Sequence, residues 1–225
     1  MGPAIGQILP FAVGVAISPV PIIAVILILF TPLARRNGPA FAAGWVAALF
    51  LVCGITILVA SGGDVATEST PSDAAYAVKF LLGAVLLLLA LNQWRRRPGE
   101  GEASRMPGWM QTIDSFTPPK SFGMGVLLAG VNPKNLLLSV GSGLTIAQQD
   151  PSSAGALGAL VAFVIVASAT VAGPVLYYLL AGPTAEGQLD SLKAWLIQNN
   201  AAVMTVLLLI FGAVLIGQGF AGLTA

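Results

Sequence analysis

The sequence predicts an all-α polytopic membrane protein with six transmembrane helices, arranged as two inverted three-helix repeats. Three observations lead to this prediction: the composition, six long apolar runs, and two proline motifs that break the first and fourth runs. The 225 residues are 56% hydrophobic and only 8% charged, whereas soluble domains carry about 25% charged residues. A span needs about 20 mostly apolar residues, and the chain offers six such runs, over residues 5–30, 39–61, 76–94, 121–147, 155–181 and 200–221.

The charges of the connecting segments predict the orientation. With six spans, segments 31–38 and 95–120 lie on one face of the membrane and hold most of the basic residues: Arg35, Arg36, Arg95, Arg96, Arg97, Arg105 and Lys120. The opposite face receives Asp64, Glu68, Asp73 and Asp150. An excess of Lys and Arg marks the cytoplasmic side. We therefore expect a multi-pass protein of the cytoplasmic (inner) membrane with both termini extracytoplasmic. Lys79, at the outer end of the third span, is expected to snorkel to the surface.

The two halves of the chain resemble each other. A shift of 114 residues places Ser18-Pro19 on Asn132-Pro133, and a shift of 129 places the run 82–86 (LGAVL) on the run 211–215 (FGAVL). Because three is an odd number, repeating a three-span unit inverts it, which is the plan of many secondary transporters. The sequence thus divides into a first repeat, 1–94, a cytoplasmic linker, 95–120, and a second repeat, 121–225.

Two connecting segments are predicted to form amphipathic helices. Apolar residues of the linker recur at three- and four-residue spacing on one helical face: Met106, Trp109, Met110, Ile113 and Phe116. This face fits either a helix in the headgroup layer or a linker helix packed on the protein. Segment 186–198 is a second case, with Leu189, Leu192, Trp195 and Leu196.

Each proline motif indicates a helix start inside a membrane span. Ser18 and Asn132 are capping residues, and each precedes a proline at the first helical position, Pro19 or Pro133. Pro21 removes one further N–H group from the first motif. A helix that restarts in mid-membrane leaves backbone N–H groups that lipid cannot satisfy. Broken helices at matching places in two halves of a chain indicate a transporter's binding site.

Lys134 is the most informative residue of the second motif. It lies about 14 residues into its span, roughly 20 Å along a helix, and an ionisable residue at that depth indicates a functional site. All nine acidic residues fall in connecting segments, so no span offers a carboxylate partner. Four alternatives remain for Lys134. It snorkels to the surface from a simple proline kink, it is a neutral amine, it reaches a water-filled cavity, or it binds an anionic ligand at the helix start. We expect the anion site, with five binding residues and three motif prolines: Lys134, Asn132, Asn135, Ser18 and Ser139, and Pro19, Pro21 and Pro133.

The composition argues against several functional classes. The chain has no histidine and a single cysteine, Cys53, so zinc hydrolysis is not expected and no metal or cofactor is predicted. A net charge of +1 gives no field that favours nucleic acid. The chain has no G-x-x-x-x-G-K-[ST] motif, which binds nucleotide phosphates. We therefore expect a membrane protein that is not an enzyme and that draws energy from an ion gradient, a partner pump or a lipid gradient.

The six spans and the two proline motifs, ISPVP at 17–21 and GVNPKN at 130–135, resemble the LysE superfamily of small exporters. Within it, the chain is most similar to the actinobacterial and mycobacterial GAP-like proteins, the glycopeptidolipid-addressing and sulfolipid-addressing proteins. The resemblance covers nearly the whole chain. It implies a role in moving cell-envelope glycolipids from the inner membrane toward the surface, alongside large lipid exporters. It marks the capping residues, the prolines and Lys134 as motif positions but assigns no role to each.

Three functions fit these observations. The first is a transporter or transport accessory for an anionic amphiphile, such as a cell-envelope glycolipid, whose head group binds at Lys134. Membrane lipids are then its ligands, and a larger lipid-export pump or a second copy of the chain is its expected partner. The second is an exporter of a small hydrophilic metabolite, such as an amino acid, whose carboxylate meets the same site. The third is an assembly subunit of a lipid-export complex that transports nothing itself.

Overall fold

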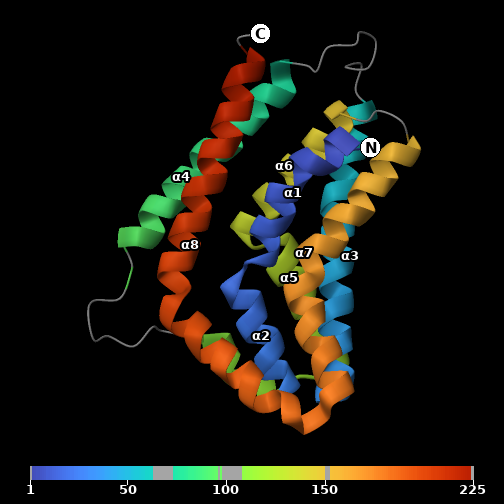
Figure 1. The fold of residues 1–225 in the computed structure, drawn as a ribbon, viewed down its shortest axis with the longest axis vertical. Helices are drawn as coiled ribbons and strands as arrows, with labels where there is room; N and C mark the ends of the chain where they lie inside the picture. The colour runs from blue at the N-terminus through green and yellow to red at the C-terminus, as the bar shows by residue number, and fades with distance from the viewer. Residues whose placement is uncertain (1, 63–72, 96, 98–107, 150–152, 224–225) are drawn as a thin grey trace.

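A computed structural model describes residues 2–62, 73–95, 97, 108–149 and 153–223, and all the secondary-structure elements within them are helices. Figure 1 shows helices that run up and down the molecule, with both chain ends at the same end. The elements, in chain order, are α1 (Gly2–Ala16), α2 (Pro19–Leu29), α3 (Ala34–Gly62), α4 (Asp73–Arg95), η2 (Gly108–Ser115), α5 (Pro118–Gly130), α6 (Pro133–Gln149), α7 (Ser153–Ala181), η3 (Gly182–Ala185) and α8 (Glu186–Leu223).

The described residues contain four helices that are long and apolar enough to cross a membrane, namely α3, α4, α7 and α8. A fifth span results if α1 and α2, which meet at a bend of 53°, are counted together. The all-α, multi-pass prediction is confirmed. The predicted fourth span, 121–147, is divided between α5 and α6, which have 13 and 17 residues, each fewer than the about 20 that a span typically needs. The count of six therefore stays a prediction.

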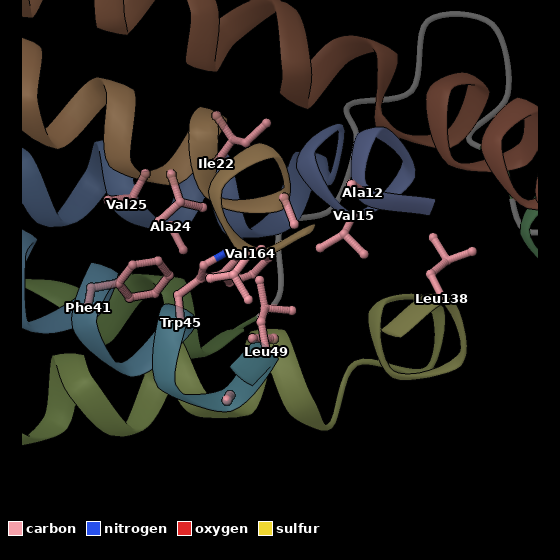
Figure 2. Packing of buried hydrophobic residues seen from close by; sticks show 14 of the residues in the cluster. Ala12, Val15, Ile22, Ala24, Val25, Phe41, Trp45, Leu49, Leu138 and Val164 are labelled. Carbon is pink, nitrogen blue, oxygen red and sulfur yellow. The ribbon is translucent and has the colours of Figure 1, made fainter. Parts of the chain in front are cut away.

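The centre of the molecule is formed by α2. Nine of its eleven residues are buried, as expected for a helix that is apolar on every side. The helices α3, α7 and α8 pack around it. Figure 2 shows that Phe41, Trp45 and Leu49 lie on the side of α3 that faces Val164 of α7. The helix that follows the first break is thereby held inside a packed core.

The helices α3 and α5 cross with their backbones in contact. A Cβ atom on Gly44 of α3 would collide with the carbonyl oxygen of Phe122, and one on Gly125 of α5 would collide with that of Phe41. Two glycines, one from each helix, thus permit the crossing, as small residues do between membrane helices. This contact fixes α5, and with it the start of α6, against α3.

The linker helix is packed on the protein, which was one of its two predicted placements. The described part forms a 3₁₀ helix, η2, and not an α-helix. Met110, Ile113 and Phe116 are buried in the hydrophobic core, and the side-chain amide of Asn37 donates a hydrogen bond of 2.9 Å to the carbonyl oxygen of Phe116. The apolar face predicted from the sequence is therefore covered by protein.

Segment 186–198 is helical, as predicted, and its Leu189 and Leu196 are buried in the hydrophobic core. It is not a separate helix, because α8 runs without interruption from Glu186 to Leu223; Figure 1 shows this helix changing direction below α2. One further expectation was wrong. Lys79 does not snorkel: it is 3% exposed, and its ammonium donates a hydrogen bond of 2.5 Å to the side-chain oxygen of Gln148 on α6. Some residues used to predict the topology and the linker face lie outside the described residues: Asp64, Glu68, Arg96, Arg105, Met106 and Asp150.

Candidate functional site

The two helix breaks lie beside each other, with Ile17 and Val131 exposed at the surface and the polar side chains directed inward. The first separates Ala16 from Pro19 and the second separates Gly130 from Pro133, so both breaks fall at the predicted motifs. Across them the hydroxyl of Ser18 donates a hydrogen bond of 2.7 Å to the side-chain oxygen of Asn135. Both residues are buried. The structure therefore brings together motifs that are separated by more than a hundred residues of chain.

The two helix starts are capped in different ways. In the second motif the side-chain oxygen of Asn132 accepts a hydrogen bond of 3.1 Å from the backbone N–H of Lys134, as predicted for a cap. In the first motif Ser18 has the extended backbone of a cap but makes no side-chain cap bond. A capping side chain bonds the second or third N–H of its helix, and the third residue here is Pro21, which has none. The Ser18 hydroxyl is free to bond Asn135 instead.

Some backbone carbonyl oxygens at the end of α1 lack the N–H partner that a continuous helix would give them. In a continuous helix the carbonyl of Gly14 would accept from Ser18 N–H, and that of Ile17 from residue 21. Here Ser18 N–H donates to the carbonyl of Ala16, and residue 21 is a proline. Two carbonyl oxygens at the negative end of the α1 dipole therefore lack their helix bonds.

Lys134 supplies the missing donors. Its ammonium donates to the carbonyl oxygens of Gly14 at 2.6 Å and of Ile17 at 3.4 Å, and the residue is only 2% exposed. No carboxylate among the described residues pairs with it. Of the four alternatives for Lys134 taken from the sequence, none named this partner, which is the C-terminal end of another half-helix. The ammonium has three N–H groups, and these two bonds use two of them.

The second break is satisfied in the same way. The carbonyl of Leu128 would accept from Asn132 N–H in a continuous helix, but that N–H donates to Leu127. The side-chain amide of Asn135 donates to the Leu128 carbonyl instead, at 2.9 Å. Gly14 and Leu128 are matched positions under the 114-residue shift. Neighbouring side chains of α6 thus satisfy the equivalent orphan carbonyl of each break.

The helix α7 adds a partner that the sequence reasoning did not select. The hydroxyl of Thr170 donates a short hydrogen bond to the carbonyl oxygen of Ala16. The signal available in the sequence was a polar residue in the middle of a long apolar run, which does not identify its partner. Gly14 was likewise missed, because its contribution is a backbone oxygen.

A buried polar face runs along α6 away from the breaks. Asn135, Ser139 and Ser142 recur at four- and three-residue spacing, so they share one face, and all three are fully buried. The hydroxyl of Ser139 has no hydrogen-bond partner within the described part of the protein, whereas that of Ser142 lies within hydrogen-bond reach of the Cys53 thiol of α3. Buried polar groups are normally paired with protein or water. The structure thus places Ser139 next to the expected site but gives it no protein partner.

The described residues contain no group of three His, Cys, Asp or Glu side chains that would hold a metal ion. The chemistry of the site is that of a buried lysine amino group surrounded by carbonyl oxygens, hydroxyls and amide groups.

Comparison with known proteins places the chain in a family. No curated protein matches it, and no solved structure does. The sequence profile of one family, described as Sap, sulfolipid-1-addressing protein, matches residues 8–221. This match spans both helix breaks and nearly the whole chain, in agreement with the resemblance drawn from the two motifs. The chain therefore belongs to the sulfolipid-1-addressing protein family.

Proposed function

We propose that the protein moves an anionic amphiphile, a cell-envelope glycolipid or a related lipid, from the inner membrane toward the surface. The observation that carries this proposal is the Lys134 ammonium, which is 2% exposed and lies where the two helix breaks meet. The family is one of membrane transport and addressing, and its name refers to a sulfolipid. A sulfate group is an anion that an ammonium would bind.

The head group would bind at the third N–H of the Lys134 ammonium. Asn132, Asn135, Ser18 and Ser139 would complete the site around it, while Pro19, Pro21 and Pro133 keep the helix starts open. The polar face of α6 supports a path that leads away from the breaks, because the Ser139 hydroxyl, which has no partner among the described residues, could bond water or a head group. The lipid tails would remain against the apolar outer surfaces of the helices.

We also infer that the chain consists of two inverted three-helix repeats with six spans. In that arrangement α5 corresponds to α1, and α7 to α3. The observed packing supports this inference, since α3 lies along α5, α7 lies along α1, and α4 pairs with α8. Figure 1 shows both termini at one end of the molecule, which fits an even number of spans. The predicted division at residues 94 and 120 and the extracytoplasmic termini belong to the same proposal.

The test is to compare surface-extractable with total envelope lipids in cells that lack the protein. These cells are complemented with wild type, Lys134→Gln, or Lys79→Gln, which alters a second buried lysine away from the breaks. Immunoblotting of membranes checks that each variant is present in equal amount. We expect one acidic lipid to disappear from the surface while its total amount persists, with wild type and Lys79→Gln restoring it and Lys134→Gln failing to do so.

Two other outcomes would each overturn part of the proposal. An unchanged lipid profile would contradict lipid transport and direct attention to the medium, where a small metabolite that is no longer exported would be sought. Restoration by Lys134→Gln would contradict head-group binding at Lys134 and favour an assembly subunit.

A further inference from the structure

The carbonyl oxygens at the end of α1 form a site that suits a cation. Two of them, from Gly14 and Ile17, converge on one point inside the protein, and this point holds the nitrogen of Lys134. Discontinuous helices of membrane transporters bind Na⁺ at such C-terminal ends, where unwound carbonyls face the ion. In this protein a side chain from the other half of the molecule occupies that position.

The charge of the ligands favours a monovalent ion. The groups around the ammonium are neutral backbone oxygens at the negative end of a helix dipole, and no carboxylate of the described residues joins them. Divalent ions such as Ca²⁺ are bound with the help of Asp and Glu carboxylates. An ammonium group carries one positive charge and three N–H donors. Two of these donors bond the two carbonyl oxygens, and the third remains for another partner.

We propose that the end of α1 is a monovalent-cation site whose permanent occupant is the Lys134 ammonium, so that the protein works without sodium. Removing this side chain would leave the Gly14 and Ile17 carbonyls without a partner and make the protein depend on a small cation from solution. The inference goes beyond the proposed function, because it concerns what holds the broken helix together and not which molecule is transported.

Lys79 provides a matched control. It is also buried, at 3% exposed, but its ammonium bonds the side-chain oxygen of Gln148. That oxygen belongs to an amide that can rotate to another partner, whereas the carbonyls of Gly14 and Ile17 are fixed in the backbone. Truncation of Lys79 therefore creates no fixed carbonyl site for a free cation.

The experiment measures the unfolding temperature of the purified full-length protein in detergent, in chloride salts of sodium, methylammonium and choline at equal ionic strength. Methylammonium reproduces the end of the lysine side chain, and choline is too large for the vacated space. We expect wild type and Lys79→Ala to unfold at the same temperature in all three salts. We expect Lys134→Ala to unfold at a lower temperature in choline and to recover with rising sodium or methylammonium concentration, as binding to the folded state requires.

Three results would overturn the proposal. The first is an unfolding temperature of Lys134→Ala that does not depend on the salt. The second is a rise in the unfolding temperature of Lys79→Ala with sodium or methylammonium that equals the rise for Lys134→Ala, and the third is a higher unfolding temperature of wild type in sodium than in choline. If Lys134→Ala cannot be purified as folded protein in choline, this variant and Lys134→Met are extracted again in methylammonium. Folded protein that is obtained only in methylammonium supports the proposal. Failure to obtain folded protein in any of the salts contradicts it. No lipid enters this measurement, so its failure is distinguishable from failure of lipid transport.

Discussion

Gly83 of α4 and Gly212 of α8 face each other where these two helices cross. A Cβ atom on Gly83 would lie 2.7 Å from the carbonyl oxygen of Gly212, and one on Gly212 would lie 3.1 Å from that of Gly83. The two glycines occupy equivalent places in the repeated runs 82–86 and 211–215. If a half-turn about an axis relates the two halves of the chain, that axis passes between the two glycines. A residue can lie next to its own counterpart in the other repeat only beside such an axis.

The first prediction concerns this crossing. Gly83→Ala places a methyl group against two backbone atoms, Gly212 O and Ile216 N, both at 2.7 Å, so the helices must separate. We expect the free energy of unfolding in detergent to fall by about 1–3 kcal/mol, the usual cost of overpacking. Gly217→Ala, on the same helix α8, is the control, because a Cβ atom there meets nothing within 4 Å. Equal losses for the two variants would contradict the close crossing.

The second prediction concerns the bond between the two breaks. Ser18→Ala leaves the Asn135 side-chain oxygen buried without its donor, which costs about 1–3 kcal/mol of unfolding free energy. Asn135→Ala should cost more, because the Leu128 carbonyl also loses its donor. A double-mutant cycle between the two positions should give a coupling of about 0.5–3 kcal/mol.

The control for this cycle is Thr145→Val. The Thr145 hydroxyl is also buried, but it bonds the Gly141 carbonyl of its own helix at 2.8 Å, so it joins no second element. This variant should show no coupling to Ser18→Ala. A coupling near zero between Ser18 and Asn135 would show that the breaks are not joined by this bond.

The third prediction concerns the polar face of α6. If water or a head group reaches the Ser142 hydroxyl, then Ser142→Cys in a Cys53→Ala background should react with a small hydrophilic thiol reagent in intact membranes. Leu144→Cys lies on the opposite face of the same helix, and the native Leu144 is buried; this variant should not react. Equal reaction of the two cysteines, or reaction of neither, would count against a path along this face.

The fourth prediction concerns orientation. Arg36 and Lys120 lie at the end of the molecule where α3 and α5 begin, and Ala154 lies at the opposite end where α7 begins; all three are exposed. In spheroplasts, a membrane-impermeant maleimide should label Ala154→Cys, and should label Arg36→Cys and Lys120→Cys only after permeabilisation. The unmodified protein is the control, since Cys53 is buried. The reverse pattern would place the termini in the cytoplasm.

The positions of the helix breaks could be predicted from the sequence because the signal is local. Proline alone does not end a helix here, since Pro10, Pro39 and Pro174 lie inside α1, α3 and α7. A capping residue directly before Pro19 and Pro133 distinguishes the two breaks. The partner of Lys134 could not be predicted in this way. The Gly14 and Ile17 oxygens belong to the backbone, and every residue has such an oxygen; only the packing of α6 against α1 makes these two available.

The amphipathic linker shows a different limit. The spacing of Met110, Ile113 and Phe116 correctly identified the apolar side, but spacing does not distinguish burial in lipid from burial in protein. The Asn37 amide that fixes the Phe116 carbonyl comes from another helix. The continuity of α8 was missed because polar residues at 198–200 resemble a loop, although a long helix tolerates them where it leaves the apolar region.

The dependence of the α1 end on Lys134 has a consequence for biosynthesis. The chain emerges from the ribosome N-terminus first, and Lys134 follows Gly14 by 120 residues. Until then the first break enters the bilayer with carbonyls that lipid cannot satisfy. We therefore expect the leading half of the nascent chain to reach its final conformation only after the trailing half has delivered the Lys134 amino group.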